Sequence, residues 1–205
     1  MAIRALLATL MLAWSLAAAE HPMASAVVQR LDDVLIAVLK QADTLGYAGR
    51  VQRLTPMVRE AFDVPFMAEK SLGAHWKTLS EADRARWIAL STEFSVANYA
   101  ANFDRYTGQT IELLGEEPAG NDTAVVRTRI VDPKGESVAM SYRLHPTPAG
   151  WKIIDIYLKD TVSELALRRA DYTSVLERDG FEGLATVMRS RIDDLASGRA
   201  KRQGS

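Results

Sequence analysis

The stretch that decides the fold is residues 138–165, V-A-M-S-Y-R-L-H-P-T-P-A-G-W-K-I-I-D-I-Y-L-K-D-T-V-S-E-L. Apolar and polar side chains alternate over residues 138–145, with the period of two that is typical of a β-strand. After a turn rich in proline and glycine, residues 151–158 are apolar at both parities, which indicates a strand with both faces partly covered. The stretch therefore predicts a β-hairpin that leads, through a cap at Thr161 or Ser163, into a helix.

The chain begins with a segment typical of a secretory signal peptide. Residues 1–19 contain one basic residue, Arg4, and then a mostly apolar run that ends in the small-residue site A-A-A. That run is shorter than the roughly 20 residues that a membrane-spanning helix needs. We expect cleavage before Glu20; the alternative is an uncleaved N-terminal anchor. No cysteine follows the site, so a lipoprotein anchor is excluded.

Length and composition favour one exported domain that is stabilised by packing alone. Residues 20–196 make about one domain by the usual length prior, and the polar tail 197–205 is expected to be disordered. The chain has no cysteine, so disulfides cannot stabilise it. Lys and Arg number 25 against 26 Asp and Glu, so the chain has no excess of basic residues for binding nucleic acid.

Helices are expected on both sides of the strands. Apolar spacing and capping residues predict a helix over residues 25–45 and a second over 49–62, which Pro56 breaks or kinks, or where a new helix starts with Thr55 as cap. A short helix is expected after Asp63, ending at Gly73, and a long one over 81–106 after the capping box of Ser80 and Asp83. Strands are expected over 110–114 and 124–131, and, after the hairpin, helices over 162–178 and 181–196. Helices, then consecutive antiparallel strands, then helices again predict an α+β fold with four strands.

The sequence contains no recognisable motif for catalysis or metal binding. The three histidines, His21, His75 and His145, have no metal-ligand spacing, and no nucleophile or phosphate-binding motif is present, so we expect neither metal nor cofactor. Adjacent carboxylates such as Asp32 and Asp33 point about a quarter-turn apart on a helix, and we expect them to be solvated.

Two polar groups of the sheet remain candidates. Asp155 lies among isoleucines, where burial can raise a carboxyl pKa and make the group a base; the favoured interpretation is that it pairs with Arg143 or another arginine. Arg127, Arg129 and Arg143 lie on neighbouring predicted strands. They form either a small anion site for a head group or, as strand arginines more often do, a solvent-exposed surface.

The order of several short motifs resembles the MlaC and toluene-tolerance family of periplasmic lipid carriers. The matching stretches are F-D-V-P-F-M-A from Phe62, S-L-G-A-H-W at residues 71–76, L-S-E-A-D-R-A-R-W ending at Trp87, the aromatic-rich residues 94–106, Y-R-L from Tyr142, G-W-K-I-I-D from Gly150 and V-S-E-L from Val162. Residues 163–181 resemble the hopanoid-associated HpnM branch. The family usually has a glycine where this chain has Lys159, Asp160 and Thr161.

The resemblance implies helices packed on a twisted four-stranded sheet, related to the nuclear-transport-factor-like fold, with an apolar cavity between them. It implies a periplasmic protein that carries hopanoid or phospholipid between an inner-membrane transporter, such as an RND-type hopanoid exporter, and an outer-membrane acceptor. The alternatives are an enzyme on the same fold with Asp155 as base on a small apolar substrate, and a non-catalytic adaptor of a membrane complex. The predicted lipid-contacting residues are apolar or aromatic: Leu72, Trp76, Phe94, Phe103, Val126, Met140, Tyr142, Ile154 and Ile156. Tyr142 is the candidate for a hydrogen bond to a head group at the cavity rim.

Overall fold

The fold was analysed in a computed structural model, which describes residues 23–199. The expected signal peptide 1–19, His21 and the end of the tail lie outside the described residues. Along the chain the elements are α1 (Ala24–Lys40), α2 (Ala42–Ala61), α3 (Val64–Leu72), the 3-10 helix η1 (Gly73–Thr78), α4 (Glu81–Asn102), β1 (Thr110–Ala119), β2 (Thr123–Val131), β3 (Ser137–Thr147), β4 (Gly150–Leu158), β5 (Val162–Ser163) and α5 (Glu164–Ala196). The predicted α+β class is confirmed.

The sheet is an open antiparallel meander in the order β1-β2-β3-β4-β5. It has one strand more than the sequence predicts, because Val162 and Ser163 pair with β4 before the helix begins. A bulge shifts the β3–β4 register, so that Ile153 pairs with Leu144 and Asp155 with Arg143. The bulge explains the apolar run on both parities, because it lets Ile153 and Ile156 share the covered face while Asp155 turns to the other.

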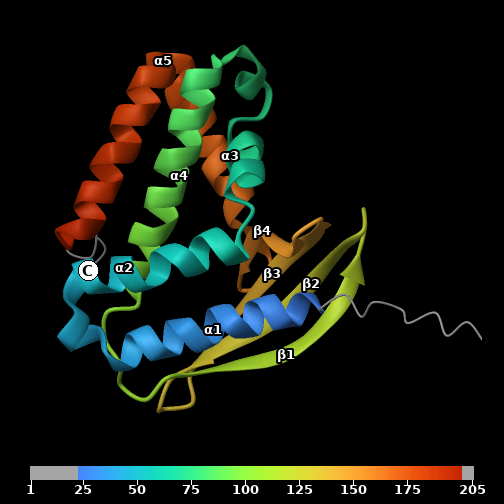
Figure 1. Ribbon diagram of the computed structural model, residues 1–205, viewed down its shortest axis with the longest axis vertical. Coiled ribbons are helices and arrows are strands. Elements are labelled where there is room, and N and C mark those ends of the chain that lie inside the picture. Colours follow the sequence, from blue (N-terminus) through green and yellow to red (C-terminus); the bar gives the residue numbers. More distant parts are fainter. Residues whose placement is uncertain (1–22, 200–205) are drawn as a thin grey trace, which may run out of the picture.

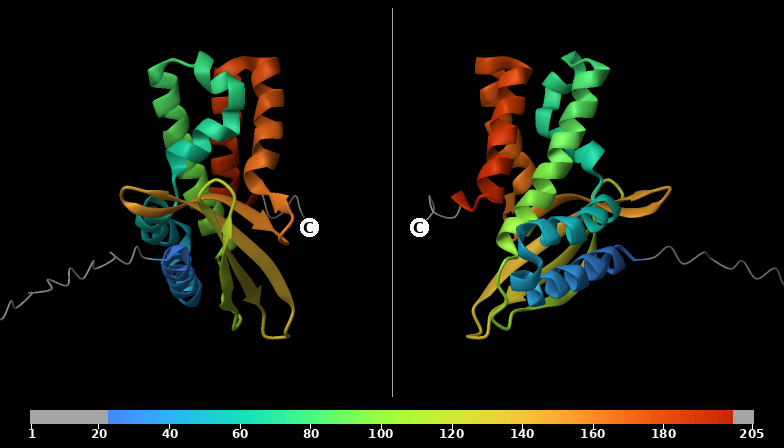
Figure 2. Two further views of the ribbon diagram at one scale, coloured as in Figure 1. Left: turned by 90° about the vertical axis from the view of Figure 1, so that its right-hand side faces the viewer. Right: turned by 60° about the vertical axis from the view of Figure 1, so that its left-hand side comes forward.

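Helices α1 and α2 lie across one face of the sheet, and the opposite face has no helix layer (Figures 1 and 2). We call the hydrophobic cluster under these helices the sheet core. Its fully buried members come from α1, α2, the C-terminal half of α4 and the strands, and include Val28, Leu31, Leu35, Leu54, Val58, Ala100, Val126, Tyr142, Leu144 and Ile153. The sheet core thus joins segments that are far apart in the sequence.

A second cluster, which we call the helical core, lies above the sheet where α3, α4 and α5 stand together (Figure 1). Its buried members are Ala68, Leu72, Trp87, Leu90, Tyr172, Leu176, Leu184, Ala185 and Met188. Trp87 is at its centre, with its ring edge-on to Tyr172 at 5.1 Å and to Phe181 at 6.4 Å between ring centroids. Helix α4 runs through both cores, since Trp87 lies in the helical core and Tyr99 in the sheet core.

The predicted helix caps are confirmed at three positions. Asp63 accepts a hydrogen bond from the backbone N–H of Phe66, Ser80 from that of Asp83, and Ser163 from that of Ala166. Left-handed glycines interrupt α2 at Gly46 and α5 at Gly180, and Gly73 ends α3, as their positions predict.

Three local predictions are wrong. Pro56 does not break α2: its fixed φ suits a helix, and Thr55 donates to the carbonyl of Val51 instead of capping a new helix. Helix α4 ends at Asn102, four residues before the predicted Tyr106. The first strand extends from Thr110 to Ala119 across a bulge, well beyond residue 114.

The loop that departs from the family pattern has an unusual backbone. Lys159 and Asp160 both have positive φ, 51° and 58°, in the left-handed region that glycine adopts without strain. The Asp160 carboxylate accepts a hydrogen bond from the Ser141 hydroxyl at 2.5 Å, which compensates part of that strain. A glycine would adopt this backbone without strain. This chain has no glycine in the loop and stabilises the same backbone with the contact between Asp160 and Ser141.

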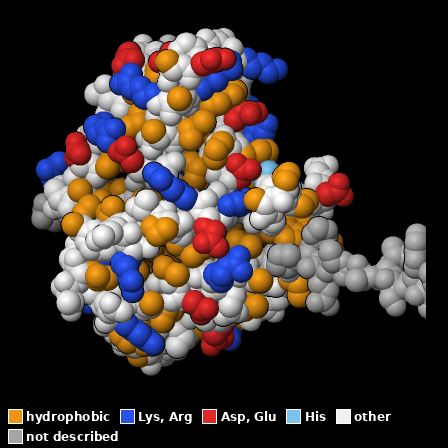
Figure 3. Space-filling view, viewed as in Figure 1, with side chains coloured by type: hydrophobic (Ala, Val, Ile, Leu, Met, Phe, Trp, Pro, Cys, Tyr) orange, Lys and Arg blue, Asp and Glu red, His pale blue; other side chains and the backbone are white. Residues whose placement is uncertain are grey.

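The described residues offer no membrane span and no charge patch of one sign on the face drawn in Figure 3. No helix between residues 23 and 199 is long and apolar enough to cross a bilayer. Acidic and basic side chains alternate over the face in Figure 3, with hydrophobic side chains between them. This surface agrees with the nearly balanced composition of the chain.

Candidate functional site

A pocket lies at the seam between the two cores. Its walls come from the α2–α3 junction, α3, the middle of α4, β4 and the first turns of α5. The lining residues are Phe62, Val64, Met67, Ala68, Ser71, Ser91, Phe94, Ser95, Asn98, Tyr99, Ile156, Glu164, Leu165, Arg168 and Tyr172. We call this the seam pocket. It is the place in the described chain where helices from the helical core meet the edge of the sheet.

The seam pocket is narrow in this conformation. Its cavity volume is about 40 Å³, which is enough for a very small number of water molecules. Ligand pockets generally have about 300–1,000 Å³. The predicted apolar cavity between helices and sheet is therefore present as a nearly closed pocket, and any ligand larger than water requires its walls to move apart.

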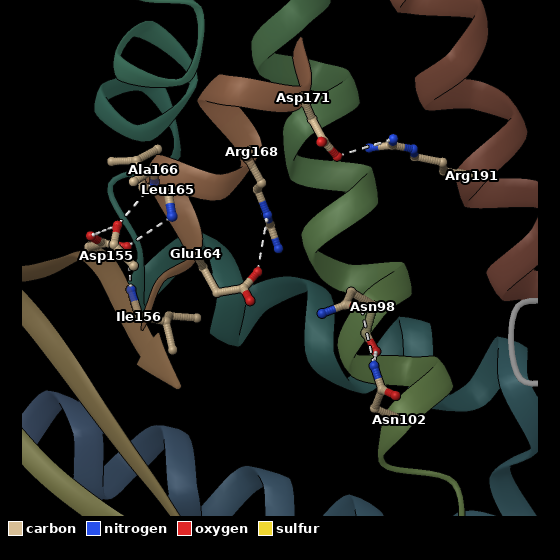
Figure 4. Close-up of polar contacts among 11 residues, drawn as sticks. Asn98, Asn102, Asp155, Ile156, Glu164, Leu165, Ala166, Arg168, Asp171 and Arg191 are labelled. Atoms are coloured by element: carbon tan, nitrogen blue, oxygen red, sulfur yellow. Dashed lines mark hydrogen bonds and ion pairs between the residues drawn. The ribbon is translucent and has the colours of Figure 1, made fainter. Parts of the chain in front are cut away.

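One end of the seam pocket is charged. Figure 4 shows Glu164 and Arg168 on the first turns of α5 beside Asn98 of α4. The Arg168 Nε atom lies 3.6 Å from a Glu164 carboxylate oxygen, and the two side chains are 23% and 25% exposed. The guanidinium of Arg168 also stacks on the Phe94 ring, 4.9 Å from its centroid. An apolar pocket thus opens beside one cation and one anion.

The structure brings only part of the predicted lipid-contacting set to the seam pocket. Phe94 and Ile156 line it. The other seven residues pack elsewhere: Leu72 and Trp76 in or against the helical core, Phe103, Val126, Met140 and Tyr142 in or against the sheet core, and Ile154 in an open groove of about 540 Å³ on the other side of β4. For Tyr142 the expected place at the rim is wrong, because its side chain is fully buried behind α1 and α4.

The predicted head-group arginines do not form one site. Arg127 pairs with Glu117 and Arg129 with Glu112 on the exposed face of the sheet. Arg143 donates to the Thr123 hydroxyl at 3.0 Å and lines the open groove beside Ile154. Neighbouring acidic residues on β1 therefore occupy two of the three guanidinium groups, and none of the three lines the seam pocket.

A buried polar cluster lies behind Tyr99, which lines the seam pocket. The buried hydroxyls of Tyr99 and Tyr142 interact with each other, and one oxygen of Asp32 is buried without a hydrogen-bond partner among the described residues. Burial raises the pKa of both tyrosines, and burial together with the charge of Asp33 raises the pKa of Asp32 to about 7. The expectation that Asp32 is solvated is wrong: it is 5% exposed, because α1 turns it toward the sheet core.

Asp155 has a structural role that the sequence did not predict. Its carboxylate accepts hydrogen bonds from the backbone N–H groups of Ile156 at 2.8 Å and Leu165 at 3.1 Å, and from the Ser163 hydroxyl at 2.6 Å. These bonds, drawn in part in Figure 4, fix the start of α5 to β4. The expected ion pair with Arg143 is absent, because that guanidinium is directed to Thr123 and the carbonyl of Gly120.

Sequence reasoning missed the polar wall of the seam pocket, although a signal was present. Ser91, Ser95 and Asn98 follow one another at spacings of four and three, together with Phe94, so they share one face of α4. Glu164, Arg168 and Tyr172 share one face of α5 in the same way. A polar stripe on helices that also carry buried aromatic residues indicates a wall that borders a cavity.

Comparison with known proteins gives one consistent result. The family model described as MlaC protein matches residues 29–190. The intermembrane phospholipid transport system binding protein MlaC of Haemophilus influenzae is 22% identical over 136 residues, 62% of this chain and 60% of that relative, so the match leaves much of the relative uncovered. A phospholipid-binding protein from Ralstonia solanacearum, solved in complex with a phospholipid, has the same fold with a TM-score of 0.74 and 22% identity, over 84% of this chain and 98% of that one. The family model covers well over half of the present chain, so the chain belongs to the MlaC protein family.

Proposed function

We propose that this protein is a periplasmic lipid carrier that binds phospholipid or hopanoid in the seam pocket and performs no catalysis. The observation that carries the proposal is the pocket itself: an apolar space between two separately packed cores, with charged groups at one end. Its membership of the MlaC protein family and the phospholipid in the complex of the Ralstonia solanacearum protein support lipid as the ligand class.

The hydrophobic effect is sufficient to hold such a ligand. Each methylene that leaves water contributes about 0.8 kcal/mol, so an acyl chain or a hopanoid ring system binds without strong polar contacts. Phe62, Met67, Phe94 and Ile156 supply apolar and aromatic contacts in the pocket, and the flexible thioether of Met67 adapts to ligands of different shape.

Binding requires the seam to open. The pocket is bounded on one side by α3, which is only nine residues long, and on the other by α4, which belongs to both cores. Displacement of the α2–α3 junction and the first turns of α5 from the middle of α4 widens the pocket.

Export by the signal peptide places the protein between two membranes. We propose that it exchanges lipid with an inner-membrane transporter, an RND-type hopanoid exporter for the hopanoid case, and with an outer-membrane acceptor. The likeness of residues 163–181 to the hopanoid-associated branch supports hopanoid, and the comparisons support phospholipid.

The proposal is tested by lipid extraction and by filling the pocket. Protein secreted by its own host is purified without detergent, and its bound lipid is identified by native mass spectrometry and extraction. Ser95→Trp places a large ring on the pocket side of α4, and Ala89→Trp places the same ring on an exposed position of that helix. We expect bound lipid in the unmodified protein and in Ala89→Trp, and at least a tenfold loss in Ser95→Trp.

Three outcomes contradict the proposal. Equal lipid content in both tryptophan variants, with unchanged thermal unfolding, would show that lipid binds elsewhere. Absence of any co-purifying lipid, together with a stable membrane partner in a pull-down, would favour the adaptor. A reproducible hydrolytic or isomerase activity that Asp155→Asn abolishes would favour the enzyme.

A further inference from the structure

Arg168 differs from the paired arginines of the sheet, Arg127 and Arg129, in its location and in its carboxylate contact. Among the described residues that line the seam pocket it is the one cation, and Glu164 is the one anion. Arg127 and Arg129 have carboxylate partners at 2.6 and 2.7 Å, whereas Arg168 has its carboxylate at 3.6 Å. That distance is too long for a hydrogen bond, so Glu164 neutralises Arg168 without using its N–H groups.

The guanidinium is oriented but not saturated. Its Cζ atom lies over the Phe94 ring, 4.9 Å from the ring centroid, and this contact holds the group at the pocket wall. A guanidinium has five N–H donors, and within residues 23–199 no acceptor takes a hydrogen bond from Arg168. A planar fork of free donors at a fixed place matches a phosphate oxygen pair.

The surroundings favour an anion that comes with an apolar body. Arg168 is about three-quarters buried, so its field is screened less than that of a surface arginine. The Asn98 side chain lies close by on α4; its carbonyl oxygen accepts a bond from Asn102, and its amide group is left to donate. The apolar lining leads directly inward from these groups.

We propose that Arg168 is the residue that contacts the phosphate of a bound phospholipid, and that Glu164 occupies its place as counter-ion when no lipid is bound. The proposal rests on the lipid-binding function proposed above and adds a preference for lipids with a phosphate over neutral lipids of the same chains. On binding, a phosphate diester takes two N–H donors of Arg168, and the Glu164 carboxylate turns to solvent. No covalent step is involved.

The test measures two lipids that differ only in the phosphate-bearing head group. Transfer of pyrene-labelled phosphatidylglycerol and of pyrene-labelled diacylglycerol with identical chains, from phosphatidylcholine vesicles to the protein, gives two partition constants for each variant. For Arg168→Gln we expect at least a tenfold loss for phosphatidylglycerol and a change below twofold for diacylglycerol. For Glu164→Gln we expect phosphatidylglycerol to bind about threefold more tightly, because the competing carboxylate is removed.

Two further variants make the result specific. Arg168→Lys keeps the charge and loses the planar fork, so we expect an intermediate loss for phosphatidylglycerol. Arg169→Gln removes the neighbouring charge, which lies beside Gly73 and lines the open groove, and is expected to leave both lipids within twofold. Glu164→Gln and Arg168→Lys decide the question even if Arg168→Gln does not fold.

Three outcomes overturn the proposal. If Arg168→Gln weakens the binding of both lipids equally, with unchanged circular dichroism, Arg168 contributes by packing on Phe94 and does not recognise the phosphate. Lipid binding in the pocket, the function proposed above, would still stand. If the partition constant of phosphatidylglycerol is unchanged in Glu164→Gln and in Arg168→Lys, the pair of Arg168 and Glu164 has no role in binding the phosphate. Binding of neither lipid by the unmodified protein would overturn both this proposal and the carrier function.

Discussion

The sheet core and the helical core differ in whether their buried polar groups have hydrogen-bond partners. In the helical core the indole N–H of Trp87 donates to the Ser71 hydroxyl at 3.2 Å, and that hydroxyl donates to the carbonyl of Ala68 at 2.8 Å. In and beside the sheet core, one oxygen of Asp32 is buried without a partner among the described residues, and the buried hydroxyls of Tyr99 and Tyr142 interact with each other. Unpaired buried polar atoms cost free energy, so the sheet core is the region with the most to gain from rearrangement.

This difference suggests how the seam opens. A satisfied core of contiguous helices moves as a unit, whereas a core with unpaired polar atoms has alternative arrangements of similar energy. Tyr99 belongs to the less satisfied core and lines the seam pocket. We therefore expect ligand entry to move the first turns of α5 and the α2–α3 junction away from the middle of α4, and to repack the sheet core around Tyr99.

The largest expected effect comes from the centre of the helical core. Trp87→Ala removes a fully buried ring that contacts Tyr172 and Phe181, and should lower the free energy of unfolding by about 3–5 kcal/mol. Because the two cores pack separately, we expect hydrogen exchange to accelerate in α3 and α5 and to remain slow in β2 and β3. Leu35→Ala in the sheet core should give the reverse pattern. Uniform acceleration in both variants would show that the two cores unfold as one.

The next effect tests the unpaired carboxyl of the sheet core. The pKa of Asp32 rises from 3.8 to about 7 on folding, so the folded state binds an extra proton between these values. The free energy of unfolding should therefore fall as the pH rises from about 4 to about 7 and then level off. At 1.36 kcal/mol per pKa unit the fall is at most about 4 kcal/mol.

Asp32→Asn is the matched variant, since it cannot ionise. We expect it to be nearly as stable as the unmodified protein at pH 5 and more stable by about 2–4 kcal/mol at pH 8, in urea unfolding at both pH values. The two proteins differ at no other residue, so the difference between them isolates Asp32. A parallel pH dependence in both would mean that this carboxyl is not desolvated.

A smaller effect is expected where the two regions are joined. Asp155→Ala leaves two backbone N–H groups and the Ser163 hydroxyl without their acceptor, which should cost about 1–3 kcal/mol. Asp160→Ala, which removes only the contact with Ser141, should cost less. Hydrogen exchange over residues 160–172 and urea unfolding measure both. Equal stability of Asp155→Ala and the unmodified protein would argue that the start of α5 is held by packing alone.

Much of this fold follows from local patterns in the sequence. The caps at Asp63, Ser80 and Ser163 and the helix end at Gly73 are short-range chemistry, and each is found where it was predicted. The alternation and turn residues of residues 138–158 likewise specify the hairpin. These features depend on neighbours within a few residues, which a single sequence displays.

The parts that were not predicted depend on contacts between distant segments. The bulge in β4 turns Asp155 away from Ile153, and its partners then come from β5 and α5 instead of from Arg143. The division into two cores decides that Val126 and Tyr142 are packed away from the seam while Ser95 and Arg168 border it. Periodicity identifies a buried face, but it does not show which other segment covers that face.

The smallest expected effect comes from arginines on the exposed face of the sheet, and it tests whether that face or the seam pocket binds the lipid head group. Arg127 and Arg129 form ion pairs with Glu117 and Glu112 in which every side chain is about half exposed, and such pairs contribute about 0–1 kcal/mol. The double variant Arg127→Gln/Arg129→Gln should therefore change the free energy of unfolding by less than about 1 kcal/mol. It should leave the partition of phosphatidylglycerol within twofold, because neither residue lines the seam pocket. A tenfold loss for phosphatidylglycerol but not for diacylglycerol would place the head group on the exposed face of the sheet, as the sequence pattern of strand arginines suggested, and would remove the reason to assign that role to Arg168.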